Sequence, residues 1–135
     1  MAGYSQTPLS KKLGYKLGFQ VITVSEPRDY WDWLAPLPNE VKVLMRAGKG
    51  SADLVHLFAT QSRVFQKEVL KLKKAIRPDG MIWISWPKKS SGVVSDLDEN
   101  VIRDFALKNG LVDVKVCAVS DVWSGLKLVI PVKLR

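Results

Sequence analysis

Two lysines and two serines follow each other directly after a strongly apolar segment. Residues 81–86 read MIWISW, and after Pro87 come Lys88, Lys89, Ser90, Ser91 and a glycine. Ammonium groups and hydroxyls donate hydrogen bonds well to phosphate or carboxylate oxygens. A glycine in such a loop lets the backbone approach a ligand closely. The chemistry predicted for this loop is therefore the binding of an anion.

The place of the loop in the fold decides whether a ligand can reach it. In open parallel sheets, ligands bind in the crevice outside the carboxyl ends of the strands. The loop 87–95 leaves the end of a predicted buried strand and precedes a predicted helix, so its side chains should border such a crevice. We predict that Trp86 and Trp123 wall this site. Arg46, at the end of another predicted strand, should add a further positive charge.

Other interpretations of the same residues stay open. Asp96, Asp98 and Glu99 already neutralise the start of the predicted helix that follows the loop, and the alternative is a solvated loop that closes on its own acids. Trp123 lies in the segment SDVWSG, where packing across the end of the sheet is an alternative role and base stacking is another.

The chain holds one histidine, His56, and one cysteine, Cys117. A single cysteine excludes an internal disulfide framework and a multi-cysteine zinc site, and a single histidine excludes paired-histidine metal motifs. His56 alternates with Leu54 and Phe58 on a predicted strand, so we expect a buried, neutral, hydrogen-bonded ring. We predict no catalytic set, no metal site and no bound cofactor.

Basic side chains dominate the charge of the chain. There are 21 Lys and Arg residues against 13 Asp and Glu, a formal charge of +8. One face of the predicted helix 61–77 carries a basic row: Arg63, Lys67, Lys71, Lys74 and Arg77. Such a row attracts polyanions in a salt-dependent manner, although an ordinary solvated helix shows it too. The chain carries no nucleic-acid motif, so nucleic acid is the weaker prediction for a partner.

The length and composition fit one globular domain spanning 1–135, with 1–18 as a lead-in segment. Of the 135 residues, 47% are hydrophobic and 25% charged. Hydrophobic periodicity predicts strands and helices. The predicted strands are 20–25, 41–45, 53–59, 81–86, 112–119 and 126–132, and the predicted helices are 28–35, 61–77 and 96–110. With no long apolar stretch and no signal-type N-terminus, we expect a cytoplasmic protein that does not bind membranes.

Several local features refine these elements. Pro78–Gly80 should form a turn between helix and strand, and Asp96 with Glu99 should begin the next helix. Strand 112–119 should alternate, with Val112, Val114, Val116 and Ala118 on one face and Asp113, Lys115 and Cys117 on the other. Pro131 cannot donate to a β-ladder, so the last strand should lie near an edge or lose pairing there.

Strands that alternate with amphipathic helices predict a three-layer, Rossmann-like α/β domain. Its sheet should be mostly parallel and end in an antiparallel C-terminal hairpin, with 81–86 as the central strand. Residues 46–52 are too few for a parallel crossover. Strands 41–45 and 53–59 therefore either pair antiparallel or are not neighbours.

Two segments, KAIRPDGMIWISW (74–86) and FALKNGLVDVKV (105–116), resemble the second half of the class I methyltransferase fold. The resemblance covers 53–132. In that family a glycine-rich loop follows the first strand and an acidic residue ends the second. Here the corresponding places read SEPRDY (25–30) and Arg46. Both departures argue against binding of S-adenosylmethionine, and the missing glycines argue against a dinucleotide.

Three further segments are similar to a family of short bacterial proteins known only as a domain of unknown function. They are GYSQTPLSKKLGYK (3–16), ISWPKKSSG (84–92) and GLVDVKVCAVSDVWSGLKLV (110–129). This resemblance implies a small Rossmann-like fold and no particular activity.

The sequence leads to one main hypothesis and two alternatives. The main hypothesis is a non-catalytic protein that binds a small anionic ligand or an acidic partner at the carboxyl edge of its sheet. The first alternative is a divergent methyltransferase-like enzyme without the usual cofactor loop. The second is a non-specific polyanion binder.

Overall fold

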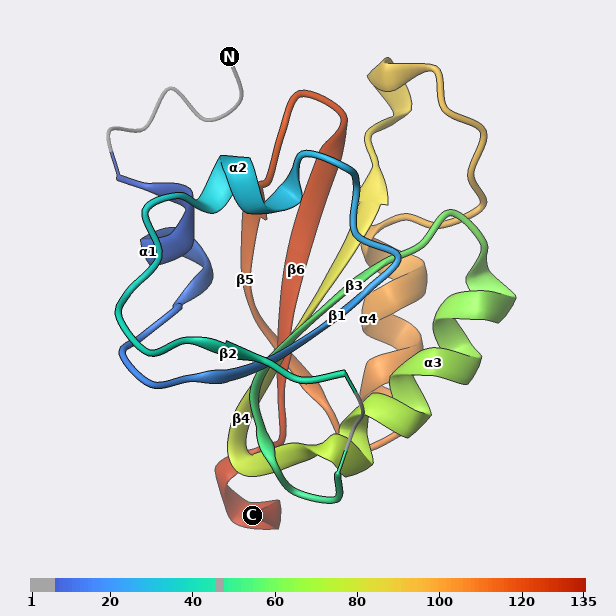
Figure 1. Cartoon of the computed structure of the whole chain (residues 1–135). Helices are drawn as coiled ribbons and strands as arrows, with labels where there is room; N and C mark the ends of the chain where they lie inside the picture. Colours follow the sequence, from blue (N-terminus) through green and yellow to red (C-terminus); the bar gives the residue numbers. More distant parts are fainter. Residues whose placement is uncertain (1–6, 46–47) are drawn as a thin grey trace.

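The computed structural model describes residues 7–45 and 48–135 as a six-stranded sheet between two helical layers (Figure 1). The strands are β1 (Gln20–Val24), β2 (Lys42–Val43), β3 (Ala52–Phe58), β4 (Ile76–Pro87), β5 (Val112–Ala118) and β6 (Trp123–Val129). Their order is β2-β1-β3-β4-β6-β5. The first four are parallel, and β6 runs antiparallel to both β4 and β5. The predicted fold class is confirmed.

Helices cover both faces of the central strands. They are α1 (Leu9–Leu13), α2 (Tyr30–Leu34), α3 (Ser62–Ala75) and α4 (Glu99–Lys108), with short 3-10 turns at Lys89–Ser91 and Val132–Leu134. On one face, α3 and α4 pack over β3, β4 and β6, whereas α1 and α2 pack on the other. Because β3 and β4 are covered on both sides, their sequences are almost continuously apolar. In the described part of the chain, no helix combines the length and apolarity needed to cross a membrane.

The order of the strands resolves the alternative left open for the second and third strands. β1 pairs with β2 on one side and with β3 on the other, so β2 and β3 are not neighbours. β2 ends at Val43, which lies level with Val21, and Leu54 near the start of β3 is paired with the same Val21, so a short connection is enough. β2 and α2 are both shorter than predicted, with two and five residues respectively.

The predicted turn at Pro78–Gly80 is wrong, because these residues form a bulge inside β4. The pairing of β3 with β4 shifts from Ala52 opposite Ile76 to Leu54 opposite Met81. The extra residues of β4 are Arg77, Pro78 and Asp79, and all three are exposed. A Cβ at Gly80 would approach the backbone oxygen of Ala52 to 3.0 Å, so glycine permits this close packing.

The C-terminal hairpin confirms one prediction and corrects another. β6 lies between β4 and β5, and its pairing ends at Val129, so the strand loses pairing before Pro131, which is one of the two predicted outcomes. β5 is the edge strand. The predicted alternation in β5 is wrong because a register shift between Asp113 and Lys115 inserts an extra residue. Asp113 and Val116 consequently lie opposite Leu128 and Leu126, which belong to the core beneath α4.

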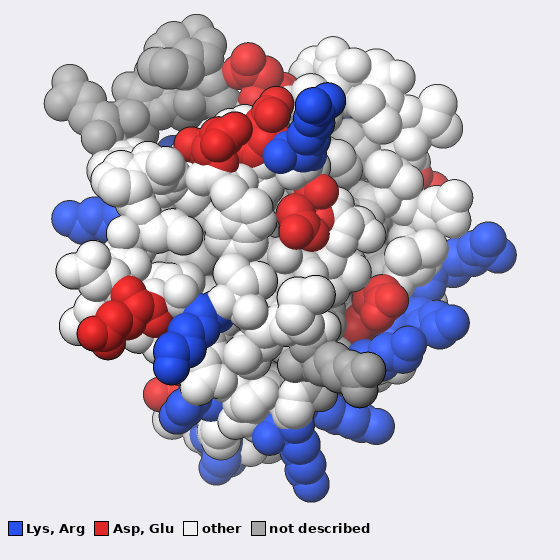
Figure 2. Space-filling model, in the orientation of Figure 1, with Lys and Arg blue, Asp and Glu red and all other residues white. Residues whose placement is uncertain are grey.

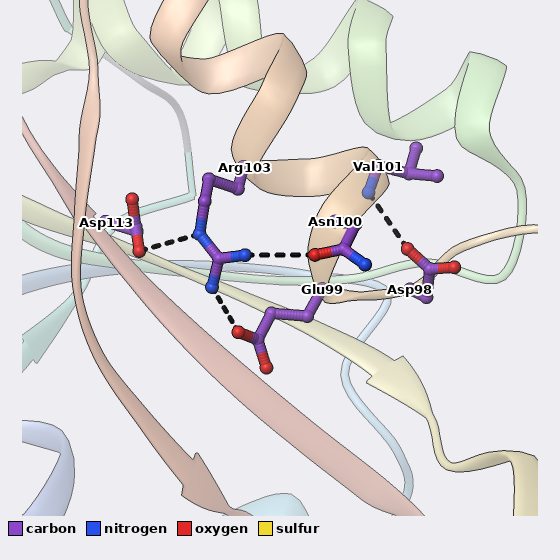
Figure 3. A network of polar contacts seen from close by, with 6 residues as sticks. All are labelled: Asp98, Glu99, Asn100, Val101, Arg103 and Asp113. Atoms are coloured by element: carbon purple, nitrogen blue, oxygen red, sulfur yellow. Dashed lines mark hydrogen bonds and ion pairs between the residues drawn. The ribbon is translucent and has the colours of Figure 1, made fainter.

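The helix predicted to begin at Asp96 begins later, and Asp96 acts on a different helix. Asp98 is the N-cap of α4, where its Oδ1 accepts from the backbone N–H of Val101 at 2.9 Å (Figure 3). Asp96 Oδ1 accepts from the backbone N–H of Ser62 at 2.6 Å, at the start of α3. The two aspartates therefore satisfy backbone donors of two adjacent helices.

Replacing either aspartate should destabilise the fold. We expect Asp96→Ala and Asp98→Ala each to lower the free energy of unfolding by about 1 kcal/mol, because each leaves a helix N-terminal N–H without its acceptor. Asp104→Ala, on the exposed face of α4, is the matched control and should change it by less than about 0.5 kcal/mol. Urea unfolding measures all three. An Asp96→Ala variant as stable as the control would contradict the assignment.

Candidate functional site

A crevice opens at the carboxyl ends of β1 and β3. The chain leaves β1 for β2 on one side and returns to β3 on the other, so this is the point where the strand order reverses. Ligands of open α/β sheets bind at such points. A cavity of about 340 Å³ lies there. Its walls are Ser25, Phe58, Ala59, Thr60, Gln61, Val64 and Trp123.

Two aromatic side chains give the crevice a rigid apolar wall. Phe58, the last residue of β3, meets the Trp123 ring edge to face, with ring centroids 5.0 Å apart. On its other sides, Phe58 stacks on His56 at 4.3 Å and meets Tyr30 edge to face at 5.4 Å. Rings held in this way lose little conformational freedom when a flat ligand packs against them.

The polar part of the crevice comes from Ser25, Thr60 and Gln61. Ser25 directly follows β1 and has a positive φ of 58°, which is uncommon for a residue other than glycine. Gln61 is the N-cap residue of α3, whose first turn contains no acidic side chain. The carboxylate of Asp96 accepts from the backbone N–H of Ser62, so the positive end of this helix dipole is already compensated.

The lysine and serine loop lies next to this crevice, at the end of β4. Lys88 N donates to the backbone oxygen of Val122 at 2.7 Å, and Lys88 Nζ donates to that of Ser120 at 3.0 Å. Both acceptors lie in the turn just before Trp123. Ser91 Oγ donates to the backbone oxygen of Lys88 at 2.6 Å, while Lys89 and Ser90 are exposed. Lys88 and Ser91 thus fix the loop, and Lys89 and Ser90 extend into solvent.

The two tryptophans predicted to wall the site lie on opposite faces of the sheet. Trp123 lines the crevice. Trp86 is only 8% exposed and belongs to the core beneath α3 and α4. Pro87 is paired with Trp123 and Trp86 with Ser124, so neighbouring positions along β4 face in opposite directions. Arg46, also predicted for the site, lies outside the described residues.

The three acids near the loop all have structural roles. Asp96 and Asp98 accept backbone N–H groups at the starts of α3 and α4. Glu99 pairs with Arg103, which also donates to Asp113 at 2.9 Å (Figure 3). Asp98 and Glu99 lie at the start of α4, as predicted, whereas Asp96 caps α3 instead.

The predicted basic row of α3 lies on the outside of the molecule. Arg63, Lys67, Lys71 and Lys74 are exposed, opposite the buried side of the helix. In Figure 2, Lys and Arg side chains gather over α3 along the lower right margin, whereas Asp and Glu side chains gather near α2 at the top. Arg77 pairs with Asp53 at 3.1 Å.

A buried chain of hydrogen bonds lies beneath the crevice, and only its histidine could be predicted from the sequence. Tyr15 Oη and Tyr30 Oη are 2.7 Å apart, and Tyr30 Oη is 2.8 Å from His56 Nδ1. His56 Nε2 is 2.7 Å from Ser85 Oγ. All four side chains are buried. The sequence shows only that these polar residues lie within otherwise apolar segments. That pattern does not reveal which side chains form hydrogen bonds with one another.

Burial sets the ionisation of this chain. It lowers the pKa of His56 to about 3 and raises the pKa of Tyr15 and Tyr30 above the usual tyrosine range. His56 is therefore neutral, as the sequence analysis expected, and the hydrogen bonds satisfy both ring nitrogens. With His56 and Ser85 both fully buried, the pair has no route to a substrate in this conformation.

Comparison with known proteins defines the fold. No protein-family model and no curated protein matches the chain. Among solved structures, an S-adenosylmethionine-dependent methyltransferase from Aquifex aeolicus is similar, with a TM-score of 0.62, 16% identity, and coverage of 89% of this chain and 86% of that one. A ribosomal protein L11 methylase from Lactobacillus delbrueckii subsp. bulgaricus has a TM-score of 0.57 and 10% identity, covering 89% and 73%.

A third solved structure extends this pattern. The magnesium protoporphyrin IX methyltransferase from Synechocystis PCC 6803, with bound S-adenosylmethionine, has a TM-score of 0.57 and 12% identity, covering 90% and 74%. The chain thus has the Rossmann-like fold of class I methyltransferases. The predicted membership of a family of bacterial proteins of unknown function stays a prediction, since no family model matches.

The residues at the cofactor position of that fold do not fit S-adenosylmethionine. The connection from β1 to α2 reads Ser25-Glu26-Pro27-Arg28-Asp29 and has no glycine that would let a cofactor approach the backbone. The helix after it, α2, has only five residues. At the end of β2 the chain continues with Leu44 and the exposed Met45 where that family has an acidic residue.

The buried histidine predicts a pH dependence of stability. An unfolded chain protonates His56 near pH 6.5, whereas the folded chain does so only near pH 3. Stability is therefore complete above pH 6.5 and falls as the pH decreases toward 3. Between pH 8 and 5 this loss should be about 2 kcal/mol, and it should be absent in His56→Gln. Urea unfolding across this pH range measures the difference between the two proteins.

A second measurement covers the case in which His56→Gln fails to fold. In the wild-type protein, NMR resonances of the His56 ring should not titrate between pH 8 and 4. A midpoint near the ordinary histidine pKa would contradict the buried, neutral assignment.

Proposed function

We propose that the protein binds a small anionic molecule with a flat ring in the crevice between β1 and β3. The observation that carries this proposal is the cavity of about 340 Å³ at the switch point, walled by Phe58 and Trp123. An apolar wall with a few polar groups at one side is the usual composition of small-molecule sites. The ring of the ligand would pack against Trp123, and its polar groups would face Ser25 and Thr60.

The anionic part of the ligand would lie toward the loop after β4. Lys88 is fixed beside the turn that carries Trp123, and Lys89 is exposed next to it. Phosphate and carboxylate are the groups that ammonium donors bind best.

In this proposal the protein binds its ligand without catalysing a reaction. Among the described residues, the one serine and histidine pair in hydrogen-bond contact is Ser85 with His56, and both are fully buried. The residues that line the crevice include no carboxylate, histidine or cysteine to act as a general base. The neighbouring methyltransferase structures support a second candidate, a divergent enzyme that holds its cofactor differently.

A titration with matched probes tests the proposal. We expect adenosine monophosphate, which has both ring and charge, to bind more tightly than adenosine or inorganic phosphate. The double variant Lys88→Ala/Lys89→Ala should weaken its binding by about tenfold, or 1.4 kcal/mol. It should weaken adenosine much less, because adenosine loses only the contact by which Lys88 Nζ holds the turn before Trp123. Trp123→Ala should weaken both. Isothermal titration calorimetry measures all of these affinities.

Two controls make the result decisive. Lys108→Ala/Lys133→Ala removes the same net charge at exposed positions away from the crevice and should leave the binding unchanged. Equal binding by wild type and the Lys88/Lys89 variant would contradict the proposal. Tight binding of S-adenosylmethionine in the same titration would favour the divergent enzyme instead.

A further inference from the structure

Four lysines from separate parts of the sequence gather on the β5–β6 hairpin, on the side that faces α1. Lys115 of β5 lies directly opposite Lys127 of β6. Lys115 Nζ donates to the backbone oxygen of Lys12 in α1 at 3.0 Å. The pKa of Lys127 is lowered, first by burial and then by the charges of Lys115 and Lys16. We name Lys12, Lys16, Lys115 and Lys127 the hairpin lysine cluster.

This arrangement opposes folding. Like charges directly opposite each other in an antiparallel pair are destabilising. Lys127 is also half-buried, so water screens its charge less than that of an exposed lysine. A fold that brings these four groups together therefore places an unfavourable positive potential on this face.

No carboxylate pairs with the cluster in the described part of the chain. The ion pairs found there join Arg77 to Asp53, and Arg103 to Glu99 and Asp113. Residues 1–6 and 46–47 contain no acid that could neutralise it. A ligand that supplies several negative charges would remove the repulsion.

We propose that the hairpin lysine cluster binds a small molecule through a diphosphate or triphosphate group. Lysine ammonium groups are strongly hydrated point charges that suit phosphate oxygens. Lys115 and Lys127 form one cross-strand pair, and the charge of Lys16 also acts on Lys127, which fits a compact multivalent anion. An extended nucleic-acid strand would instead match charges spread in a row, as on α3. The cluster shares no residue with the crevice, so the two proposals can fail separately.

Calorimetric titration with inorganic tripolyphosphate at low ionic strength tests this site. Wild-type protein should bind the probe, and Lys115→Met/Lys127→Met should bind it at least about tenfold more weakly. The methionines keep the apolar stems that pack on the sheet. Without the probe, Lys127→Met should unfold at a higher temperature than wild type, because the repulsion is gone. With the probe, wild type should gain thermal stability, and Lys127→Met should gain much less.

The matched control is Lys71→Met/Lys74→Met, which removes the same charge from a second group of lysines. Lys71 and Lys74 line a separate cavity with Lys49. This control should weaken binding of tripolyphosphate by less than threefold. Equal weakening in both double variants would show only general attraction to a basic protein and would overturn the site, as would no binding by wild type.

A single-stranded RNA oligonucleotide completes the experiment. If RNA binds more tightly than tripolyphosphate and depends on Lys115 and Lys127, the site belongs to a nucleic acid and the small-molecule assignment is overturned. If RNA binding falls equally in both double variants while tripolyphosphate binding depends on Lys115 and Lys127, the proposal stands.

Discussion

The hydrogen-bonded chain of Tyr15, Tyr30, His56 and Ser85 is the interaction on which the arrangement of this protein depends. It joins the segments of α1 and α2 to the central strands β3 and β4. Helices of five residues are too short to be stable alone, so these two need tertiary contacts to persist. Each polar group in the chain is buried, and loss of one partner would leave the next unsatisfied at a substantial cost.

The same constraint shapes the candidate site. Phe58 stacks on His56 and meets Tyr30, so the wall of the crevice rests directly on the buried polar chain. Trp123 then packs on Phe58 from the hairpin side. The crevice is consequently built on a rigid base, whereas the lysine loop beside it is exposed. A rigid ring-binding wall next to the exposed charge of Lys89 suits a ligand that has both parts.

The long, periodic or continuously apolar segments could be predicted from sequence, because burial on one or both faces leaves a direct pattern in α3, β3 and β4. Predictions from neighbouring residues failed where contacts between residues far apart in the sequence determine the structure. Asp96 was predicted to begin the next helix, but it accepts from the backbone N–H of Ser62 at the start of α3. These two residues lie far apart in the sequence, so only the fold brings them together. The bulge at Asp113 broke a clean alternation. Trp123 was predicted for the site, yet Ser25, Phe58 and Thr60 were not, since placing them together requires the order of the strands.

The central claim is that the crevice between β1 and β3 receives a flat, anionic ligand. An NMR titration of isotopically labelled protein with adenosine monophosphate tests it most directly. We expect the largest chemical-shift changes on the amides of Ser25, Thr60 and Lys89 and on the indole N–H of Trp123. Changes confined to Lys115 and Lys127, or spread evenly over the basic surface, would contradict it.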